Sequence, residues 1–241
     1  ETIAGVPAPD ADLQYRPLAT VLEGARLLGK ATGIVATSRV THATPAAFVA
    51  HVHDRGMEED IMEQAVYQGV DVAFGGGGRY LLPKEDKGSR GDNEDLQQVL
   101  AGKGYAVVRT RDQMLGIQQG KVFGLFAASH MDPEIDRPRL HPEQPTLEEM
   151  TRKAIALLSK DPDGFFLMVE GSQVDWACHA NDPAHLLSDL LAFDRAVGAA
   201  LDFAPPGEKE GCLRSDEWIM AIADGLILRA ENGAVVQDLD N

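Results

Sequence analysis

Short apolar runs alternate along this 241-residue chain with segments of helical periodicity, and this alternation constrains the fold more than any other feature. The runs are apolar enough to form buried strands, and they span residues 32–38, 70–75, 105–108, 122–127, 165–170 and 217–224. Strands that alternate with helices favour parallel pairing. The sequence therefore predicts an α/β fold in which a mainly parallel central sheet has helices on both faces.

The two longest helical segments, residues 146–159 and 184–203, have recognisable starts. Thr146 and Glu149 form a capping-box pair before the first segment, and Pro183 suits the first turn of the second. The apolar side of the second segment consists of Leu187, Leu190, Leu191, Val197 and Leu201. Both segments are therefore predicted to form amphipathic helices.

Two stretches interrupt the alternation. Residues 75–95 are rich in glycine and charge, which predicts an exposed excursion, and residues 128–145 hold four prolines, which predicts a long irregular loop. Neither resembles a linker, so we expect one domain over residues 1–241. The glycine run Gly75–Gly78 is not followed by a clear helix, so the phosphate-binding P-loop pattern fails and a tight structural loop is favoured.

Composition narrows the classes of partner. The chain is 44% hydrophobic and 25% charged, as in folded proteins, and its 38 acidic and 22 basic residues give a formal charge of −16. Such a field repels nucleic acid and anionic membranes, and an anionic substrate would need local cations. The acid excess fits either a saline habitat or a site that takes up cations. No window reaches the ~18 apolar residues of a membrane span, and the first residues lack the features of a signal peptide. Cys178 and Cys212 leave the redox compartment open.

Acidic residues and a histidine follow the predicted strands. Glu170 ends one apolar run and Asp224 ends another, so parallel strands would bring both carboxylates to one edge of the sheet. Asp175 and His179 are four residues apart, which places them on one face of a helical turn. Carboxylates and imidazole suit zinc, and converging acids need a cation. The alternative is that each acid caps a turn and His179 packs in a loop.

A second cluster lies in residues 40–56. Thr44 and Pro45 predict a helix that starts there and runs to about Asp54. Because the segment follows a strand, His42 and Thr44 would also lie at the site edge, where a hydroxyl can bind Mg²⁺. Arg55 follows the helix, and a solvated salt bridge is the simpler account of it. Structural roles are expected for the remaining histidines: His51, His53, His130, His141 and His185.

Two long motifs together resemble the alkaline phosphatase family. The stretch ATGIVATSRVTHATPAAFVAHVHDR is similar to the segment that leads into that family's magnesium site, and MVEGSQVDWACHANDP is similar to its metal-binding signature. The stretches DVAFGGGGRYLLP, FGLFAASHMDPEIDRP and LLAFDRAVGAALDFA match its intervening loops and a later helix. The likeness covers nearly the whole chain and implies an alkaline phosphatase-like fold.

The resemblance implies a metal-dependent phosphomonoesterase with two zinc ions and one magnesium ion. Thr44 and Glu170 match magnesium ligands, and His42 occupies a neighbouring position of the metal site where members carry aspartate or histidine. The implied partners are phosphate monoesters or inorganic phosphate, without nucleic acid or a membrane span. Because members of the family are commonly exported and dimeric, the resemblance also implies a periplasmic or extracellular location and a homodimer.

The zinc and phosphate sites are implied in the same way. Asp175 and His179 match ligands of one zinc, and Asp224 matches a ligand of the other. Arg55 matches the arginine that holds the phosphate oxygens, which suits its planar guanidinium. This arginine argues against a third alternative, a phosphodiesterase or phosphonate hydrolase of the same superfamily.

The chain also departs from the family pattern. The family's nucleophilic serine lies in an Asp-Ser-Ala motif, and no serine here has that context: Ser38, Ser89, Ser129, Ser159, Ser172, Ser188 and Ser215. Asp224 is followed directly by Gly225, where members carry a zinc-ligand histidine, and a later zinc-ligand histidine also has no counterpart. We therefore expect little phosphatase turnover from this polypeptide, either as a fragment or as a degenerate relative. The alternative function is a non-catalytic protein that binds metal or phosphate, or acts as a subunit.

Overall fold

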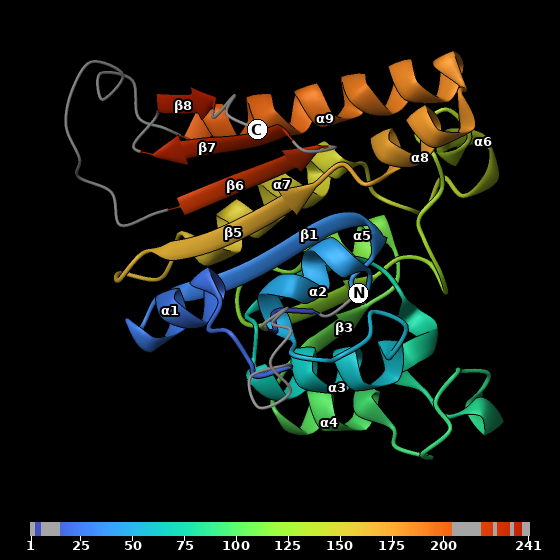
Figure 1. Ribbon diagram of the computed structural model, residues 1–241, viewed down its shortest axis with the longest axis vertical. Helices are drawn as coiled ribbons and strands as arrows, with labels where there is room; N and C mark the ends of the chain where they lie inside the picture. Colours follow the sequence, from blue (N-terminus) through green and yellow to red (C-terminus); the bar gives the residue numbers. More distant parts are fainter. Residues whose placement is uncertain (1–2, 6–14, 204–217, 224–225, 232–233, 238–241) are drawn as a thin grey trace.

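A computed structural model describes residues 3–5, 15–203, 218–223, 226–231 and 234–237. The strands in these segments form one eight-stranded sheet with the order β3-β4-β2-β1-β5-β6-β7-β8 (Figure 1). The strands are β1 (Ala31–Arg39), β2 (Val72–Gly76), β3 (Ala106–Val108), β4 (Val122–Leu125), β5 (Phe165–Glu170), β6 (Trp218–Ala223), β7 (Leu226–Glu231) and β8 (Ala234–Gln237). Pairing is parallel from β3 to β6 and antiparallel from β6 to β8, so the predicted mainly parallel sheet is confirmed. The antiparallel β7–β8 hairpin is an addition to the six predicted strands.

Helices cover both faces of the sheet, as predicted. They are α1 (Val21–Leu27), α2 (Ala43–Val49), α3 (Glu58–Gln68), α4 (Leu96–Gly102), α5 (Arg111–Gly116), α6 (Arg137–Leu140), α7 (Leu147–Leu158), α8 (Gln173–Ala180) and α9 (Pro183–Phe203), with the 3₁₀ helices η1 (Gly78–Leu81) and η2 (Lys84–Asp86). Helix α7 packs on β1, β2 and β5, whereas α1 packs on β1 and β5 from the other side. No helix of the described segments is long and apolar enough to cross a membrane.

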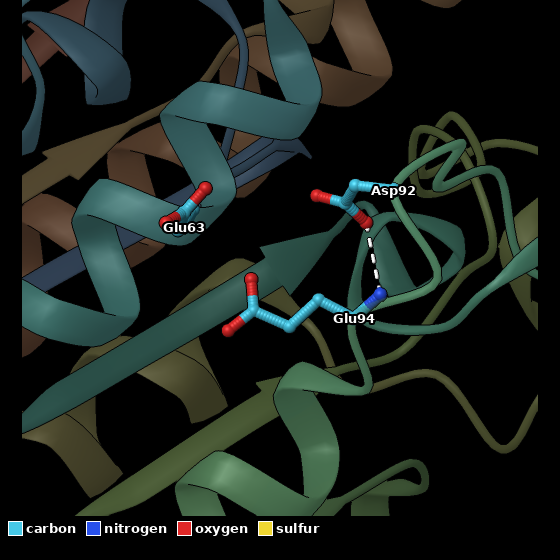
Figure 2. A group of neighbouring side chains, drawn as sticks. All are labelled: Glu63, Asp92 and Glu94. Atoms are coloured by element: carbon cyan, nitrogen blue, oxygen red, sulfur yellow. Dashed lines mark hydrogen bonds between the residues drawn. The ribbon is translucent and has the colours of Figure 1, made fainter.

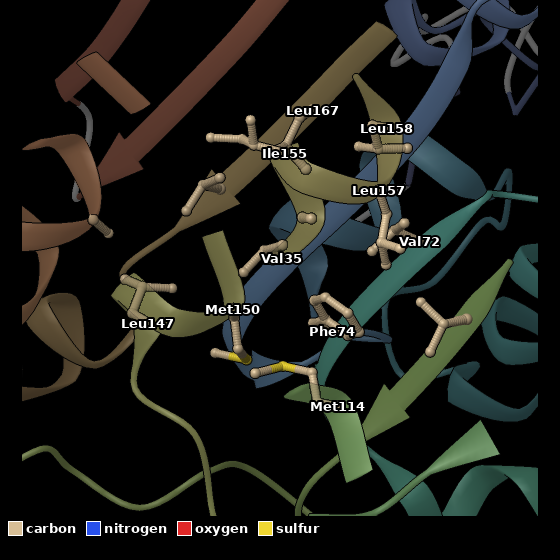
Figure 3. Close-up of a cluster of buried hydrophobic side chains, with 14 of the residues drawn as sticks. Val35, Val72, Phe74, Met114, Leu147, Met150, Ile155, Leu157, Leu158 and Leu167 are labelled. Atoms are coloured by element: carbon tan, nitrogen blue, oxygen red, sulfur yellow. The ribbon is translucent and has the colours of Figure 1, made fainter. Parts of the chain in front are cut away.

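The alternation of side chains along each strand divides the core in two. Val35 and Leu167 belong to the cluster beneath α7 (Figure 3), whereas their neighbours Ile34 and Met168 belong to the cluster beneath α1, α3 and α4. Successive residues of a strand point to opposite faces, so a sheet covered on both sides needs apolar residues at every position. This is why the strands could be predicted from continuous apolar runs rather than from alternating patterns.

The predicted start of α7 is confirmed and that of α2 is wrong. Thr146 and Glu149 form the full capping box, and the apolar face of α7 is buried. Helix α2, by contrast, begins one residue before Thr44, with His42 as the N-cap residue, and it ends at Val49 rather than near Asp54. The Thr44 hydroxyl does not cap the helix because it is hydrogen-bonded to Glu170 on the neighbouring strand.

Helix α9 also differs from its predicted packing. Asp182 caps its start, but Leu187, Leu190 and Leu191 are 58%, 45% and 49% exposed. The buried side consists of four alanines, one aromatic residue and one acid: Ala192, Ala196, Ala199, Ala200, Phe193 and Asp189. Small side chains allow α9 to lie close to α7, its main contact, so short side chains rather than leucines face the core.

Both predicted loops are more ordered and more buried than the sequence indicated. Gly75–Gly78 is buried. The Ser129 backbone approaches so closely that a Cβ at Gly76 would lie 2.0 Å from the Ser129 carbonyl oxygen. Gly77 has a φ of 97°, a left-handed conformation that favours glycine. Farther along, Arg90 is fully buried, and the 128–145 segment contains α6 and the buried side chains of Met131 and Gln144. The glycine run is therefore a close-packed structural turn, as favoured over a P-loop.

Candidate metal and phosphate site

The candidate site lies at the carboxyl ends of the adjacent parallel strands β1 and β5. Ala36 pairs with Glu170, the last residue of β5, and the chain then leaves β1 toward α2. On the far side of β5, Ile222 of β6 pairs with Glu170. Asp224, the second strand-end acid, lies outside the described residues.

Glu170 is the buried centre of the site. Its side chain is 8% exposed, and its carboxylate accepts hydrogen bonds from Ser172 Oγ at 2.6 Å and Ser38 Oγ at 3.4 Å. The Thr44 hydroxyl also bonds to it. Burial raises the pKa of Glu170, the three hydroxyl groups oppose this rise, and the nearby Asp175 carboxylate adds to it. The predicted meeting of Thr44 and Glu170 therefore occurs, whereas the two supporting serines were missed.

His42 joins the same site from the start of α2. Arg55 Nη2 lies 3.1 Å from His42 Nε2, and because a guanidinium can only donate, Nε2 is the acceptor. Burial, Arg55 and Arg39 lower the pKa of His42, so the imidazole is neutral near pH 7 and its proton is on Nδ1. His42 Nδ1 is buried and has no hydrogen-bond partner among the described residues. A buried donor of this kind is costly unless an acceptor occupies the site.

Asp175 and His179 share one face of α8, as their spacing predicted. Their side chains meet at 3.2 Å between Asp175 Oδ1 and His179 Nε2, with side-chain exposures of 41% and 79%. The Asp175 carboxylate is close enough to raise the pKa of both His42 and Glu170. The pair therefore lies at the open rim of the site, with Glu170 buried beneath.

The Arg55 side chain reaches the site through its contact with His42. It lies beyond the end of α2, in the turn before α3, and its guanidinium contacts His42. The structure therefore gathers six of the predicted residues in one place: His42, Thr44, Arg55, Glu170, Asp175 and His179.

An aromatic wall that the sequence did not predict borders the site. The indole ring of Trp176 packs edge-on against His130 and His42, with ring centroids 4.2 Å and 5.4 Å away. Arg39 contacts His130 Nε2 at 2.5 Å and pairs with Glu58 at 2.6 Å. Burial and the Arg39 charge lower the pKa of His130 to about 4, so this imidazole is neutral at ordinary pH. The only sequence signal was the position of Trp176 between Asp175 and His179.

Other histidines have the structural roles that were expected. Three of them pair with carboxylates: His51 with Glu23, His141 with Asp132 and His185 with Asp189. His130 differs because the 128–145 segment folds back against β1 and brings its ring to the site. That contact depends on tertiary packing, so its sequence neighbours could not reveal it.

A separate acidic cluster has a structural explanation. Glu63 of α3 converges with Asp92 and Glu94, which lie in the loop before α4 (Figure 2). The fully buried Arg90 guanidinium lies among them, 3.3 Å from Glu94 and 3.7 Å from Glu63, and also pairs with Asp92. The Arg90 guanidinium offsets part of the repulsion among these carboxylates, which gives the cluster a structural role.

The donors around Glu170 fit a hard divalent cation. The buried Glu170 carboxylate and the Thr44 hydroxyl are oxygen ligands of the kind that Mg²⁺ uses, and Asp175 with His179 offers the mixed oxygen and nitrogen donors of a zinc site. The orphaned His42 Nδ1–H beside these groups is a donor, so it suits an acceptor such as a water or phosphate oxygen rather than the cation itself.

A family model described as alkaline phosphatase matches residues 4–213. The chain belongs to the alkaline phosphatase family. Alkaline phosphatase 3 of Bacillus subtilis (strain 168) is 43% identical over 191 residues, which is 77% of this chain and 39% of that protein. The crystal structure of Thermus thermophilus alkaline phosphatase superposes with a TM-score of 0.78 at 36% identity, over 91% of this chain and 43% of that one.

A further solved structure similar to this chain contains bound Mg. A variant of alkaline phosphatase from the Antarctic bacterium TAB5, solved with Mg bound in its M3 site, has a TM-score of 0.72 and 32% identity, over 98% of this chain and 65% of that one. The chain spans about two fifths of the length of the first curated relatives, at 39%, 40% and 41%. The resemblance in the two long motifs is therefore confirmed at the level of the family.

Proposed function

We propose that this chain forms the magnesium half-site and the phosphate-binding arginine of a metal-dependent phosphomonoesterase. The observation that carries the proposal is the convergence of Glu170, Thr44 and His42 beside the Arg55 guanidinium. In this assignment Glu170 and Thr44 hold Mg²⁺, and His42 belongs to the same metal site. Its Nδ1–H group would donate to a water or phosphate oxygen there, which removes the cost of the orphaned donor.

We assign the zinc positions to the open rim. Asp175 and His179 would hold one zinc ion, and Asp224 would contribute to the other. Two protein ligands bind zinc weakly, because a stable site needs three or four. Bound divalent cations would neutralise the converging carboxylates and polarise the attacking and leaving oxygens of a phosphate ester.

The side chains of this chain would bind and orient the ester. Arg55 can donate two parallel N–H bonds to a phosphate group, and His42 holds its guanidinium in place at 3.1 Å. Arg55 thereby supplies a local positive charge in a chain of formal charge −16. Trp176 and His130 border the site with aromatic surface, which limits the access of water from that side.

Turnover needs a nucleophile that this polypeptide does not place in the expected motif. We therefore expect it to bind metal and phosphate but to hydrolyse p-nitrophenyl phosphate slowly, if at all, with zinc and magnesium added. Robust metal-dependent hydrolysis by the purified 241-residue chain would contradict this expectation. The protein is proposed to act on phosphate monoesters, to be periplasmic or extracellular, and to form a homodimer, as the resemblance implied.

A non-catalytic protein that binds metal or phosphate is the second candidate function. Metal stoichiometry separates the two. Close to three divalent ions per chain supports the phosphomonoesterase, whereas one or none supports the non-catalytic alternative. Inductively coupled plasma mass spectrometry after dialysis against zinc and magnesium measures this ratio.

A further inference from the structure

A cationic cavity lies on the same edge of the sheet as the candidate site, at the ends of other strands. Its volume is about 440 Å³. Its walls come from the segments that follow β2, β3 and β4, and they include Gly78, Arg109 and Phe126. In open α/β sheets, ligands bind in crevices outside the carboxyl ends of the strands. The place of this cavity is thus typical of a ligand site.

The charges around the cavity are opposite to those of the whole chain. Arg79, Lys87 and Arg109 line it, and Asp86 is the one carboxylate among the lining residues. The chain as a whole has a formal charge of −16. Three cations gathered against one acid repel one another, so this arrangement needs an explanation.

Neither arginine has an acidic partner in the part of the chain that the structure describes. Arg109 Nη2 donates to the neutral Gln97 Oε1 at 2.7 Å, and Arg79 Nη2 donates to the Tyr80 hydroxyl at 2.7 Å. Arg79 Nε is buried and lacks any hydrogen-bond partner among the described residues. Burial lowers the pKa of Arg109, and no neighbouring carboxylate offsets this effect. Half-buried cations without counterions are costly, whereas an anion in the cavity would satisfy both guanidinium groups.

The remaining walls describe the kind of anion that fits. Leu82 and Phe126 supply apolar surface, and the Gln97 amide is a neutral polar group beside Arg109. The backbone N–H groups of Gly77, Gly78 and Arg79 are already bonded to the carbonyl oxygens of Ala127 and Ala128. Recognition would therefore come from side chains, through guanidinium groups that match the oxygens of a phosphoryl group.

We propose that this cavity is a second oxyanion site, which binds the phosphoryl group of a small molecule through Arg79, Arg109 and Lys87. It is separate from the site of Arg55 and Glu170, and the inference does not depend on the proposed phosphatase function. The segment that connects the two places is residues 127–130, since Ala127 and Ala128 line the cavity and His130 packs against Trp176.

Calorimetric titration with inorganic phosphate tests the proposal. The 241-residue chain carrying Arg55→Gln is titrated in EDTA, so that neither the metals nor the arginine of the first site contributes. We expect one bound phosphate per chain, and Arg109→Gln in the same background should weaken its affinity roughly 10- to 100-fold. Arg152→Gln is the control with the same charge change, because Arg152 pairs with Glu148 and Asp202 on helices α7 and α9. Absence of phosphate binding, or equal affinity after Arg109→Gln, would overturn the proposal.

Two further variants protect the test against misfolding. Lys87→Gln changes an exposed residue and should weaken phosphate binding several-fold without altering the circular dichroism spectrum. Gly78→Ala keeps every charge, but its Cβ would lie 2.5 Å from Arg109 Nη1 and would displace the guanidinium. We expect it to weaken phosphate binding as well. Unchanged affinity in both variants would contradict the assignment.

Two ligands distinguish the sources of the phosphoryl group. Tighter binding of phenylphosphonate than of inorganic phosphate would indicate an organic phosphate whose apolar part contacts Leu82 and Phe126, whereas equal affinity would indicate free phosphate. Acetate tests the chemical class. Binding of acetate as tight as that of phosphate would overturn the phosphoryl assignment.

Discussion

The two halves of the sheet's carboxyl edge carry opposite charge. At the ends of β1 and β5, Glu170 and Asp175 converge with Arg55 as the cation at the rim. At the ends of β2, β3 and β4, Arg79 and Arg109 converge instead. The strands are equally apolar, so the difference comes from the charged residues at the strand ends and in the segments that follow the strands. If both proposals hold, one backbone arrangement presents a site for cations and a site for anions side by side.

Removing the charge of Glu170 should have the largest effect on the difference between the two halves. Glu170→Gln keeps the shape of the side chain but removes its charge, so magnesium affinity should fall by about 100-fold or more. The metal-free protein should remain at least as stable, because a buried charge has been removed. Magnesium titration by calorimetry and urea unfolding in EDTA measure the two effects. Glu143→Gln, at an exposed position, is the control, and unchanged magnesium affinity in Glu170→Gln would refute the metal assignment.

Addition of zinc and magnesium should separate the contributions of Arg55 and Arg109 to phosphate binding. With zinc and magnesium present, we expect a second phosphate to bind, and Arg55→Gln should weaken that binding event by roughly 10- to 100-fold. Arg109→Gln should leave this metal-dependent event unchanged and affect only the metal-independent one. Phosphorus NMR titration with and without EDTA separates the two events. Loss of both events in a single variant would show that the halves are one site.

The close contact between β2 and the 127–130 segment can be tested with a glycine pair. Gly76→Ala would place Cβ 2.0 Å from the Ser129 carbonyl oxygen, so we expect a loss of about 1–3 kcal/mol in the free energy of unfolding. Gly102→Ala has nothing within 4 Å of its Cβ and lies in helix α4, where it should stabilise by about 0.4–1 kcal/mol. Urea unfolding at one pH compares the two variants. Equal stabilities would mean that the close approach is not needed.

The smallest expected effect concerns how the stability of the contact between Asp189 of α9 and the 128–145 segment depends on pH. The Asp189 carboxylate accepts hydrogen bonds from the Glu134 backbone N–H at 3.2 and 3.3 Å, and burial raises its pKa from 3.8 to about 6. His185 lies 3.4 Å away and Arg195 pairs with Glu134. Because the folded state binds this proton more tightly than the unfolded state, the contribution of Asp189 to stability is complete below about pH 4 and is lost as pH rises through 6.

Asp189→Asn should remove this pH-dependent contribution, which we expect to be roughly 1–2 kcal/mol after solvent screening. The difference in unfolding free energy between the parent chain and the variant should therefore change between pH 4 and pH 7, in favour of the variant at the higher pH. Urea titrations at several pH values measure it. A constant difference across this range would show that Asp189 does not titrate as described.

The strands and the residues at their ends could be predicted because they depend on local sequence. A strand buried on both faces must be apolar throughout, so β5 was recognised from Phe165–Glu170 alone, and the acid at its end marked the site. The spacing of Asp175 and His179 likewise determined a shared helix face. The family motifs added the proposed roles of Thr44 and Arg55, which local physics left open.

Other features depend on contacts between distant segments. His130 and Trp176 meet because the 128–145 segment folds back on β1, and Arg109 faces Gly78 because β2 and β3 flank β4 in the sheet. The buried side of α9 follows from its close packing on α7, which favours alanines over the leucines of its sequence pattern.

The sequence by itself thus determined the alternation of elements and the acids at the strand ends, since periodicity and burial act over a few residues. Only the tertiary structure decided which side chains from separate loops lie together, and so which half of the edge is acidic and which is cationic. The physical reason is that strand order in the sheet, rather than order along the chain, sets which strand ends are neighbours.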